Sequence, residues 1–413
     1  MEATEKFFRQ IKKKAVGQPW AVCLGAGHGG TGVIRGLGRA GINVMALGIN
    51  SIDFGLSSKY CIGINLGEEQ WSEKMLLMLE RIAGEVPGKK VLFPDNDKFA
   101  DFIYLNSERL SPDFVWLMPP DLESYRSLSD KTHLVDSAAK AGVPFPKTVI
   151  PSSSEDLRKW CDSSLFPIVI KPINSPAFAA HFKRKGFIAD NMEEAIRFFK
   201  SAADAGFETI AQELIPGGIE SLITVYLYRS RRGKTIVSFV GKKVRQYPVD
   251  LGTASLYVSE AHPEAVILSK KLLDLNDYQG IADVEFKKDS RDGLYKVIEV
   301  NGRVPMFSGI ERGTGIPLSV HIYNDLAGKE ALEGLSEPLS GDRTRWLYAA
   351  KDAIAALSML RKKELSLFQA VHSHFAGPKT YAIWAVDDPG PGFAFLKYLL
   401  EDARAYAKKR KVI

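Results

Sequence analysis

The sequence has little cysteine and no extended apolar run. Its three cysteines, Cys23, Cys61 and Cys161, share no CxxC spacing, so we expect buried thiols in a reducing cytosol. No apolar stretch approaches the roughly 18 residues of a membrane span. Residues 1–18 are charged and lack the apolar centre of a signal peptide. These absences predict a cytoplasmic protein without a membrane segment.

A strong excess of one charge is also missing. Lys and Arg number 55 against 49 Asp and Glu, a net charge of +6, and much of the excess lies at residues 12–14 and 408–411. No basic stripe crosses the middle of the chain, so we expect no nucleic-acid partner. A composition of 45% hydrophobic and 25% charged residues excludes a mainly disordered chain. The length of 413 residues predicts two or three domains.

The first 118 residues alternate between apolar strands and amphipathic helices. We expect strands at 21–24, 42–47 and 91–94, and helices at 33–40, 68–83 and 97–106. This order predicts a parallel α/β sheet that ends at Pro119-Pro120.

A glycine loop follows the first strand. Gly25, Gly27 and Gly30 match the GxGxxG dinucleotide fingerprint in its usual place between strand and helix. The second strand lacks the acid that would bind a ribose, because Asp53 comes too late in the next loop. A tight structural turn is therefore the favoured interpretation, and dinucleotide binding is the less favoured one.

Beyond residue 120 helices and strands follow in a mixed order. We expect a helix from Ser129, as its N-cap, to Ala141, a second that starts at Asn191, and a third at 263–275. Strands are expected at 166–171, 210–215, 222–229, 234–242, 280–287 and 294–301.

The last two of these strands form a predicted hairpin that is rich in acids. Side chains alternate along a strand, so Glu285 can converge with Glu299 and Asn301 on one face. Two carboxylates and an amide oxygen suit Mg²⁺, and a cation relieves the repulsion between like charges. The alternative is an exposed hairpin whose acids are merely solvated, and the hairpin alone does not decide between the two.

Two lysines and one turn shift that balance. Lys171 ends an apolar strand, from which it can reach a phosphate. Lys131 stands at a helix N-terminus, where a cation is unfavourable unless an anion is near. Glu213 and Glu220 flank a Pro-Gly turn that can offer backbone groups to a purine and a carboxylate to ribose hydroxyls.

Five segments in this order resemble the ATP-grasp superfamily, and within it the carboxylate–amine ligases of the D-aspartate ligase type. The resemblance covers roughly residues 20–325. It rests on Asp130-Lys131, PIVIKP at 167–172, QELIPGG at 212–218, KKVRQYP at 242–248, and DVEF with IEVNGR at 283–286 and 298–303.

The resemblance implies a role for each matching position. For the phosphates of ATP it implies two lysines, Lys131 and Lys171. For adenine it implies the hinge residues Gln212, Glu213 and Leu214, and for the ribose it implies the carboxylate of Glu220. For Mg²⁺, with Mn²⁺ as an alternative, it implies three ligands: Glu285, Glu299 and Asn301. For catalysis it implies Arg303 at the transferring phosphoryl group or the substrate carboxylate, with two more cations near the phosphates: Lys243 and Arg245.

The resemblance also implies an architecture. We expect a Rossmann-like pre-ATP-grasp domain at 1–120, a small α+β lid subdomain at 121–215, a large subdomain with the metal site at 216–328 and a C-terminal extension at 329–413. One stretch departs from the family pattern, because the flap at 173–186 has a single glycine, Gly186, and three cations, Lys183, Arg184 and Lys185. Which of these cations contacts phosphate, and whether His181 is packed or solvent-facing, stays open.

The implied reaction is an ADP-forming ligation. ATP would activate a small carboxylate, such as that of an amino acid, as an acyl phosphate, and an amine would then displace the phosphate. One alternative is an ATP-grasp enzyme that transfers its phosphoryl or acyl group to a non-amine acceptor. An NAD-dependent oxidoreductase and a non-catalytic nucleotide-binding module are further alternatives. We expect small-molecule partners, with a homodimer as one option for assembly.

Overall fold

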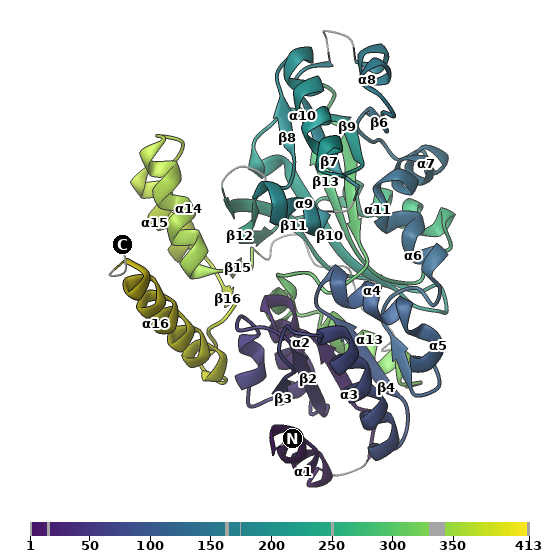
Figure 1. The fold of residues 1–413 in the computed structure, drawn as a ribbon, viewed down its shortest axis with the longest axis vertical. Coiled ribbons are helices and arrows are strands. Elements are labelled where there is room, and N and C mark those ends of the chain that lie inside the picture. Colours follow the sequence, from purple (N-terminus) through teal and green to yellow (C-terminus); the bar gives the residue numbers. More distant parts are fainter. Residues whose placement is uncertain are drawn as a thin grey trace.

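The computed structural model describes residues 2–14, 17–161, 165–173, 175–248, 252–329 and 343–410. Its strands form three sheets, of five, seven and four strands. In Figure 1 the five-stranded sheet lies at the bottom, the seven-stranded sheet in the middle and the four-stranded sheet at the top.

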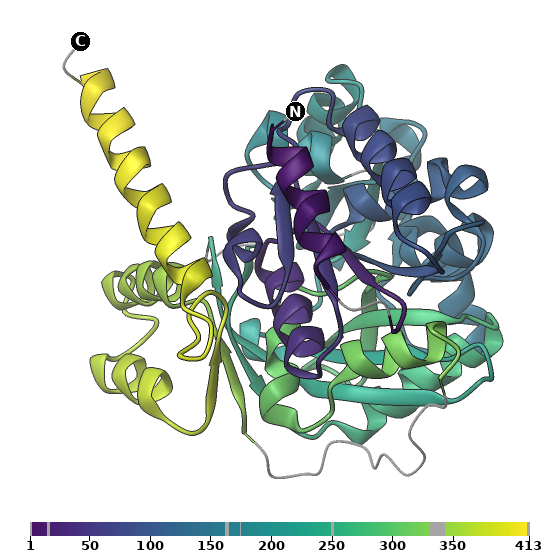
Figure 2. The same cartoon turned by 90° about the horizontal axis from the view of Figure 1, so that it is seen from below.

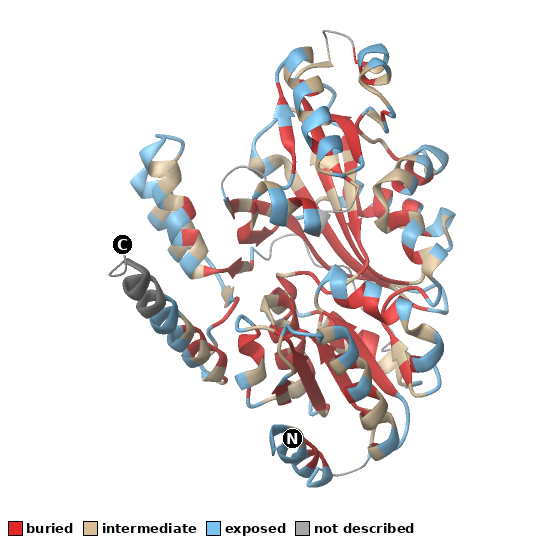
Figure 3. Cartoon of the chain, in the orientation of Figure 1, coloured by how far each residue is buried: buried red, intermediate tan, exposed pale blue. Residues whose placement is uncertain are grey.

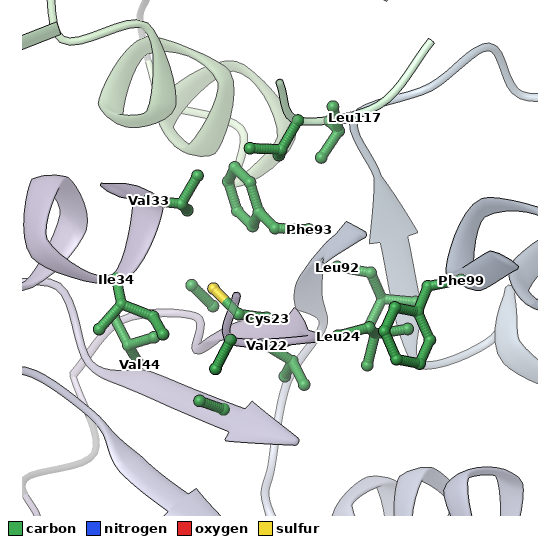
Figure 4. Close-up of a cluster of buried hydrophobic side chains, with 14 of the residues drawn as sticks. Val22, Cys23, Leu24, Val33, Ile34, Val44, Leu92, Phe93, Phe99 and Leu117 are labelled. Atoms are coloured by element: carbon green, nitrogen blue, oxygen red, sulfur yellow. The ribbon is translucent and has the colours of Figure 1, made fainter. Parts of the chain in front are cut away.

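The five-stranded sheet is parallel, with the order β3-β2-β1-β4-β5. Its strands are β1 (Ala21–Leu24), β2 (Val44–Gly48), β3 (Ile62–Asn65), β4 (Lys90–Pro94) and β5 (Phe114–Trp116). The helices around it are α1 (Glu2–Lys12), α2 (His28–Arg39), α3 (Trp71–Glu85), α4 (Asp97–Leu105) and α5 (Ser107–Leu110). Figure 4 shows apolar side chains of β1, β2, β4 and α2 meeting around the buried Cys23. The predicted parallel α/β sheet is therefore confirmed, and all three cysteines are free thiols.

The four-stranded sheet is antiparallel, with the order β6-β9-β7-β8. Its strands are β6 (Thr148–Val149), β7 (Ile168–Pro172), β8 (Phe187–Ala189) and β9 (Thr209–Glu213). Three helices belong to the same segment of the chain: α8 (Ser154–Trp160), α9 (Ser175–Phe182) and α10 (Met192–Asp204). Two more connect it to the first sheet: α6 (Leu122–Ser129) and α7 (Lys131–Ala141).

The seven-stranded sheet has the order β14-β13-β10-β11-β12-β15-β16. Its strands are β10 (Leu222–Arg229), β11 (Thr235–Tyr247), β12 (Thr253–Ser259), β13 (Gly280–Lys288), β14 (Tyr295–Asn301), β15 (Arg345–Leu347) and β16 (Lys379–Tyr381). Its helices are α11 (Pro263–Leu275), α12 (Glu311–Thr314) and α13 (Leu318–Leu326). The chain ends in α14 (Ala349–Arg361), α15 (Leu367–Phe375) and α16 (Gly390–Arg410).

The sequence-based bounds of several elements were wrong. Helix α2, expected at 33–40, begins at His28, so part of the expected glycine loop is helical. The N-cap of α7 is Asp130 rather than Ser129, because the Asp130 carboxylate accepts the Thr132 N–H at 2.8 Å. Strand β11 continues to Tyr247 instead of ending at Lys242, and its added residues pair with β12. The N-cap Asn191 is confirmed, since its side chain accepts the Glu194 N–H.

The strands of the C-terminal extension belong to the same sheet as the acidic hairpin. Strand β15 pairs antiparallel with β12, and β16 pairs with β15. The predicted boundaries at residues 120, 215 and 328 stay predictions. Within the described residues, no helix combines the length and apolar character that crossing a bilayer requires.

Candidate active site

The acidic hairpin forms the floor of the candidate site. Strands β13 and β14 pair in a register that sets Glu285 opposite Glu299 and Asp283 opposite Asn301. Side chains of directly opposed residues lie on the same face of a sheet, as do residues two apart on one strand. The structure therefore brings together the three predicted metal ligands, and adds a third carboxylate on the same face.

The neighbouring strand β11 supplies a cation to this face. Lys243 Nζ lies 3.0 Å from Glu285 Oε2, and both side chains are largely buried. Burial by itself lowers the pKa of Lys243, but the Glu285 carboxylate beside it raises that pKa above its usual value. Burial acts in the opposite sense on Glu285, and the Lys243 ammonium holds its pKa below the usual range. The two groups are thus a charged pair at neutral pH.

Arg303 completes this face from the loop after β14. Its guanidinium donates to Asn301 Oδ1 at 3.2 Å and lies 3.7 Å from Asp283 Oδ2. It also pairs with Asp97 of α4 at 3.2 Å, so it links the acidic hairpin to the first sheet's helices. Burial opposes its charge, but the surrounding acids raise its pKa above the usual value.

Asp283 is a site residue that we did not assign from the sequence. Its side chain is buried, and its Oδ1 atom has no hydrogen-bond partner among the described residues. Burial and the nearby Glu285 raise its pKa to about 8. The sequence does indicate its position, because Asp283 and Glu285 are two residues apart on one strand and so share a face. Its burial depends on packing that a sequence does not show.

The two predicted phosphate lysines lie at one narrow pocket. Its volume is about 10 Å³, close to the least that a water molecule needs. Lys171 Nζ donates to Gln212 Oε1 at 2.9 Å, and Lys131 Nζ donates to the Ile173 carbonyl at 3.5 Å. The rest of the lining is mostly apolar: Leu134, Val135, Phe145, Pro146, Ile210, Val297 and Ile298. Burial lowers the pKa of Lys171 to about 8, although Glu299 opposes this shift.

The predicted hinge follows β9 and has partners of its own. Glu213 is buried and its carboxylate pairs with Arg291, while the Leu214 N–H donates to the Pro167 carbonyl at 3.2 Å. Glu220 is exposed on a single 3-10 turn, and its carboxylate folds back over Gly218. A Cβ added at residue 218 would lie 2.3 Å from this carboxylate. The roles of these side chains toward a nucleotide stay predictions.

The side chain of Arg245 contacts the C-terminal helices rather than the acidic hairpin. Its guanidinium is 1% exposed and makes two hydrogen bonds to Asp352 of α14, at 2.8 and 2.6 Å, and one to Ser373 of α15 at 2.6 Å. These contacts join β11 to the C-terminal helices. The role of Arg245 as a catalytic cation stays a prediction.

The predicted flap contains a helix. Within residues 173–186, Asn174 lies outside the described part, and α9 buries Phe178 in the core of the four-stranded sheet. His181 is exposed, and its ring also contacts Phe182 at 4.5 Å and Phe207 at 5.8 Å between centroids. Of the three flap cations, Lys185 acts electrostatically on Glu285.

The glycine loop is occupied by carboxylates of the protein itself. Asp53 Oδ1 accepts the Ala26 N–H at 2.9 Å, and Asp95 Oδ2 accepts the Gly27 N–H at 2.9 Å. A Cβ at Gly25 would lie 2.1 Å from Asp95 Oδ1, so glycine is required for this close approach. Two backbone donors of the loop, the N–H groups of Ala26 and Gly27, therefore already have carboxylate partners.

We therefore expect NAD and NADP to bind no better than at millimolar concentration, because their phosphates would have to displace Asp53 and Asp95. MgATP, in contrast, should raise the melting temperature by mass action. Fluorescence titration with NADH and thermal unfolding with each nucleotide measure this. Micromolar NADH binding would contradict the interpretation of the loop as structural.

Comparison with known proteins identifies the fold. No protein-family model matches the chain. D-aspartate ligase of Enterococcus faecium (strain Aus0004) is 24% identical over 263 residues, which cover 61% of this chain and 62% of that protein. Biotin carboxylase of Campylobacter jejuni, solved as a β-γ-ATP complex, superposes with a TM-score of 0.61 at 16% identity, over 76% of this chain and 72% of its own. This is the ATP-grasp fold.

An L-amino acid ligase from Bacillus licheniformis shares the ATP-grasp fold, with a TM-score of 0.57, 17% identity and 75% coverage of both chains. The resemblance to D-aspartate ligase and the ATP-grasp architecture predicted from five short motifs are thus confirmed. This chain spans less than two thirds of the length of the matching D-aspartate ligase.

Proposed function

We propose that this protein is an ATP-dependent, ADP-forming ligase that joins a small carboxylate to an amine. One observation carries the proposal: Glu285, Glu299 and Asn301 share a face with Lys243 and Arg303. This combination of clustered acids and fixed cations suits phosphoryl transfer, in which catalysis is mainly positioning and charge stabilisation. The similarity to D-aspartate ligase and to an L-amino acid ligase supports it.

ATP would bind between the four-stranded and seven-stranded sheets. The pocket lined by Lys131, Lys171 and Gln212 has cations at its rim and apolar side chains for a purine. We assign Lys131 and Lys171 to the phosphates, the Gln212–Leu214 segment to adenine and Glu220 to the ribose.

The residues of the hairpin suit Mg²⁺ or Mn²⁺. Among the described residues no cluster of three or more His, Cys, Asp or Glu side chains is arranged as a complete metal site. The proposed set instead has two carboxylates, Glu285 and Glu299, and the amide oxygen of Asn301, which leaves positions for water and phosphate oxygens. When bound, the cation would neutralise charge on the phosphates of ATP.

The protein's own groups would then position the reaction. The substrate carboxylate oxygen attacks the γ-phosphorus, the bond to the β-phosphate oxygen breaks, and ADP leaves while an acyl phosphate forms. Lys243 and Arg303 supply fixed positive charge on the face where this transfer takes place. An amine next attacks the acyl carbon, and inorganic phosphate leaves as the amide forms. An amine that arrives unprotonated needs no general base from the protein in its attack.

A screen for ADP release across amino acids and amines, with mass spectrometry of the products, tests this function. An amide product formed in equal amount with ADP supports the ligase. A phosphorylated product, or an acyl group on a non-amine acceptor, would contradict it and favour the phosphotransfer alternative. ATP binding without any turnover would favour the non-catalytic module.

The pH dependence of ATP binding should report the charge of Lys171. Its pKa of about 8 in the free protein means that the ammonium is charged below pH 8 and lost above it. Phosphate binding favours the charged form, so affinity should be constant below pH 8 and fall by up to about tenfold per unit above it. Calorimetry from pH 6.5 to about 9.5 measures this. Lys171→Arg, which stays charged throughout, should flatten the profile, and an unchanged slope in that variant would contradict the assignment.

A further inference from the structure

The last three helices lie at one edge of the molecule. Helices α14, α15 and α16 lie outside the three sheets in Figure 1, and α16 projects away from the body in Figure 2. Much of their surface is exposed in Figure 3. Their exposed large apolar residues, which we call the C-terminal apolar patch, are Ile354, Leu357, Leu367, Phe368, Val371, Phe375, Phe393, Leu396, Leu399 and Leu400.

The spacing within this patch is that of a helix face made for contact. Phe368, Val371 and Phe375 recur at i, i+3 and i+7 on α15, and Phe393, Leu396 and Leu400 do so on α16. The other face of α16 is already used, because Phe395 and Tyr398 pack on Phe54. Helix α16 thus has two apolar faces, of which the described residues of this chain cover one.

The exposure does not come from a loosely attached segment. Asp352 of α14 is wholly buried, where it binds Arg245 and accepts a hydrogen bond from Ser255 at 2.9 Å. Helix α15 is attached through Ser373, whose hydroxyl accepts a hydrogen bond from Arg245 at 2.6 Å. The two helices are therefore anchored at their base while their apolar side chains face outward.

The exposed apolar side chains of the three helices, taken together, offer enough area for a stable interface. Phe368, Phe375 and Phe393 are 78%, 73% and 64% exposed, which at about 150–250 Å² per aromatic side chain amounts to roughly 300–500 Å². The aliphatic members of the patch add to this area. A typical monomer's largest apolar patch is about 300–600 Å², and a standard interface buries about 800 Å² per partner. The phenylalanines and their aliphatic neighbours together approach the second value.

We propose that a second copy of this chain covers the C-terminal apolar patch, so that the protein is a dimer through α14, α15 and α16. A symmetric contact between two copies must be self-complementary, and the patch is flanked by one group of positive and one group of negative side chains. Arg361, Lys362 and Lys363 are exposed at the end of α14, and Glu401 and Asp402 are exposed on α16. Among the described residues of one chain, these two groups form no ion pair with each other, and Glu401 has an exposed pair with Lys397 on its own helix at 3.8 Å. In a dimer each group would meet the opposite group of the partner.

Light scattering and sedimentation of the full chain test this dimer. The wild-type protein should have twice the 45.6 kDa chain mass. Phe368→Glu and Leu400→Glu should each weaken dimerisation at least about 30-fold, because the new charge enters the interface twice. Leu105→Glu changes a leucine that is 84% exposed on α4, outside the patch, and should leave the dimer intact. Circular dichroism checks that each variant is folded.

Charge reversal tests the identity of the partner surface. Lys362→Glu and Asp402→Lys should each weaken the dimer, and the double variant should restore it in part. A wild-type chain that stays monomeric at about 100 µM would overturn the proposal, and α16 folding back or a different protein would then cover the patch. A dimer that is unaffected by Phe368→Glu and Leu400→Glu would also overturn it, because the contact would lie elsewhere.

Discussion

Replacing Glu299 by glutamine should lower ATP-dependent ADP release by about 100- to 1000-fold, the range for loss of one electrostatic group at a transition state. Glu299 lies directly opposite Glu285 in the hairpin, where the two carboxylates repel each other unless a cation lies between them. Glutamine keeps the shape of the side chain and removes its charge. The substitution also removes the attraction of Glu299 for Lys171 and Arg303, so the free energy of unfolding should change little while activity is lost.

Steady-state ADP release and thermal unfolding of the same samples measure both effects. Glu260→Gln is a control for the loss of one glutamate charge beside the same sheet, because Glu260 pairs with Lys242 of β11 at 2.9 Å and, among the described residues, with no residue of the site. That variant should retain activity. Normal ADP release by Glu299→Gln would contradict the metal assignment.

Glu285→Gln should fail in a different way. It removes a proposed metal ligand and also leaves the buried Lys243 without its carboxylate partner. Breaking a buried ion pair by removing one partner typically costs about 3–5 kcal/mol. We expect Glu299→Gln to lose activity but keep its stability, and Glu285→Gln to lose both. This difference would separate the metal role of the hairpin from its structural role.

Local alternation was enough to predict the centre of this site. Glu285, Glu299 and Asn301 lie on two strands that are adjacent in sequence, so the hairpin turn and the two-residue period place them on one face. The parallel sheet was predictable for the same reason, because its strands and helices are each marked by their own periodicity. The order of the five motifs along the chain then predicted the ATP-grasp fold.

Contacts between distant segments were not predictable. Arg245 and Asp352 are 107 residues apart, and nothing near either residue indicates that the two pair in a buried site. The same holds for Asp95, whose carboxylate lies 68 residues from the Gly27 N–H that it accepts. The glycine loop matched a nucleotide fingerprint because the fingerprint describes only the glycines of a tight turn. The carboxylate that lies in this turn belongs to Asp95, which follows β4.

Arg303→Ala and Lys171→Ala should both impair the enzyme, but in different kinetic constants. Lys171 would contact ATP in the ground state and the transition state alike, so its loss should mainly raise the KM for ATP. Arg303 would stabilise charge that grows along the reaction, so its loss should lower kcat by about 100-fold or more. Asp97→Asn removes an exposed partner of Arg303 and keeps the cation, so it should have a small effect.

The acyl phosphate itself gives the decisive measurement for this pair of variants. Hydroxylamine added to the wild-type reaction should trap the activated carboxylate as a hydroxamate, and Lys171→Ala at saturating ATP should still form it. Arg303→Ala should form it about 100-fold more slowly, because the same charge stabilises its formation. If no hydroxamate forms, positional isotope exchange in ATP, with the carboxylate present and the amine absent, detects a shielded acyl phosphate. Absence of exchange, together with an unchanged kcat in Arg303→Ala, would contradict the ligase mechanism, because neither the intermediate nor the charge that stabilises it would then be required.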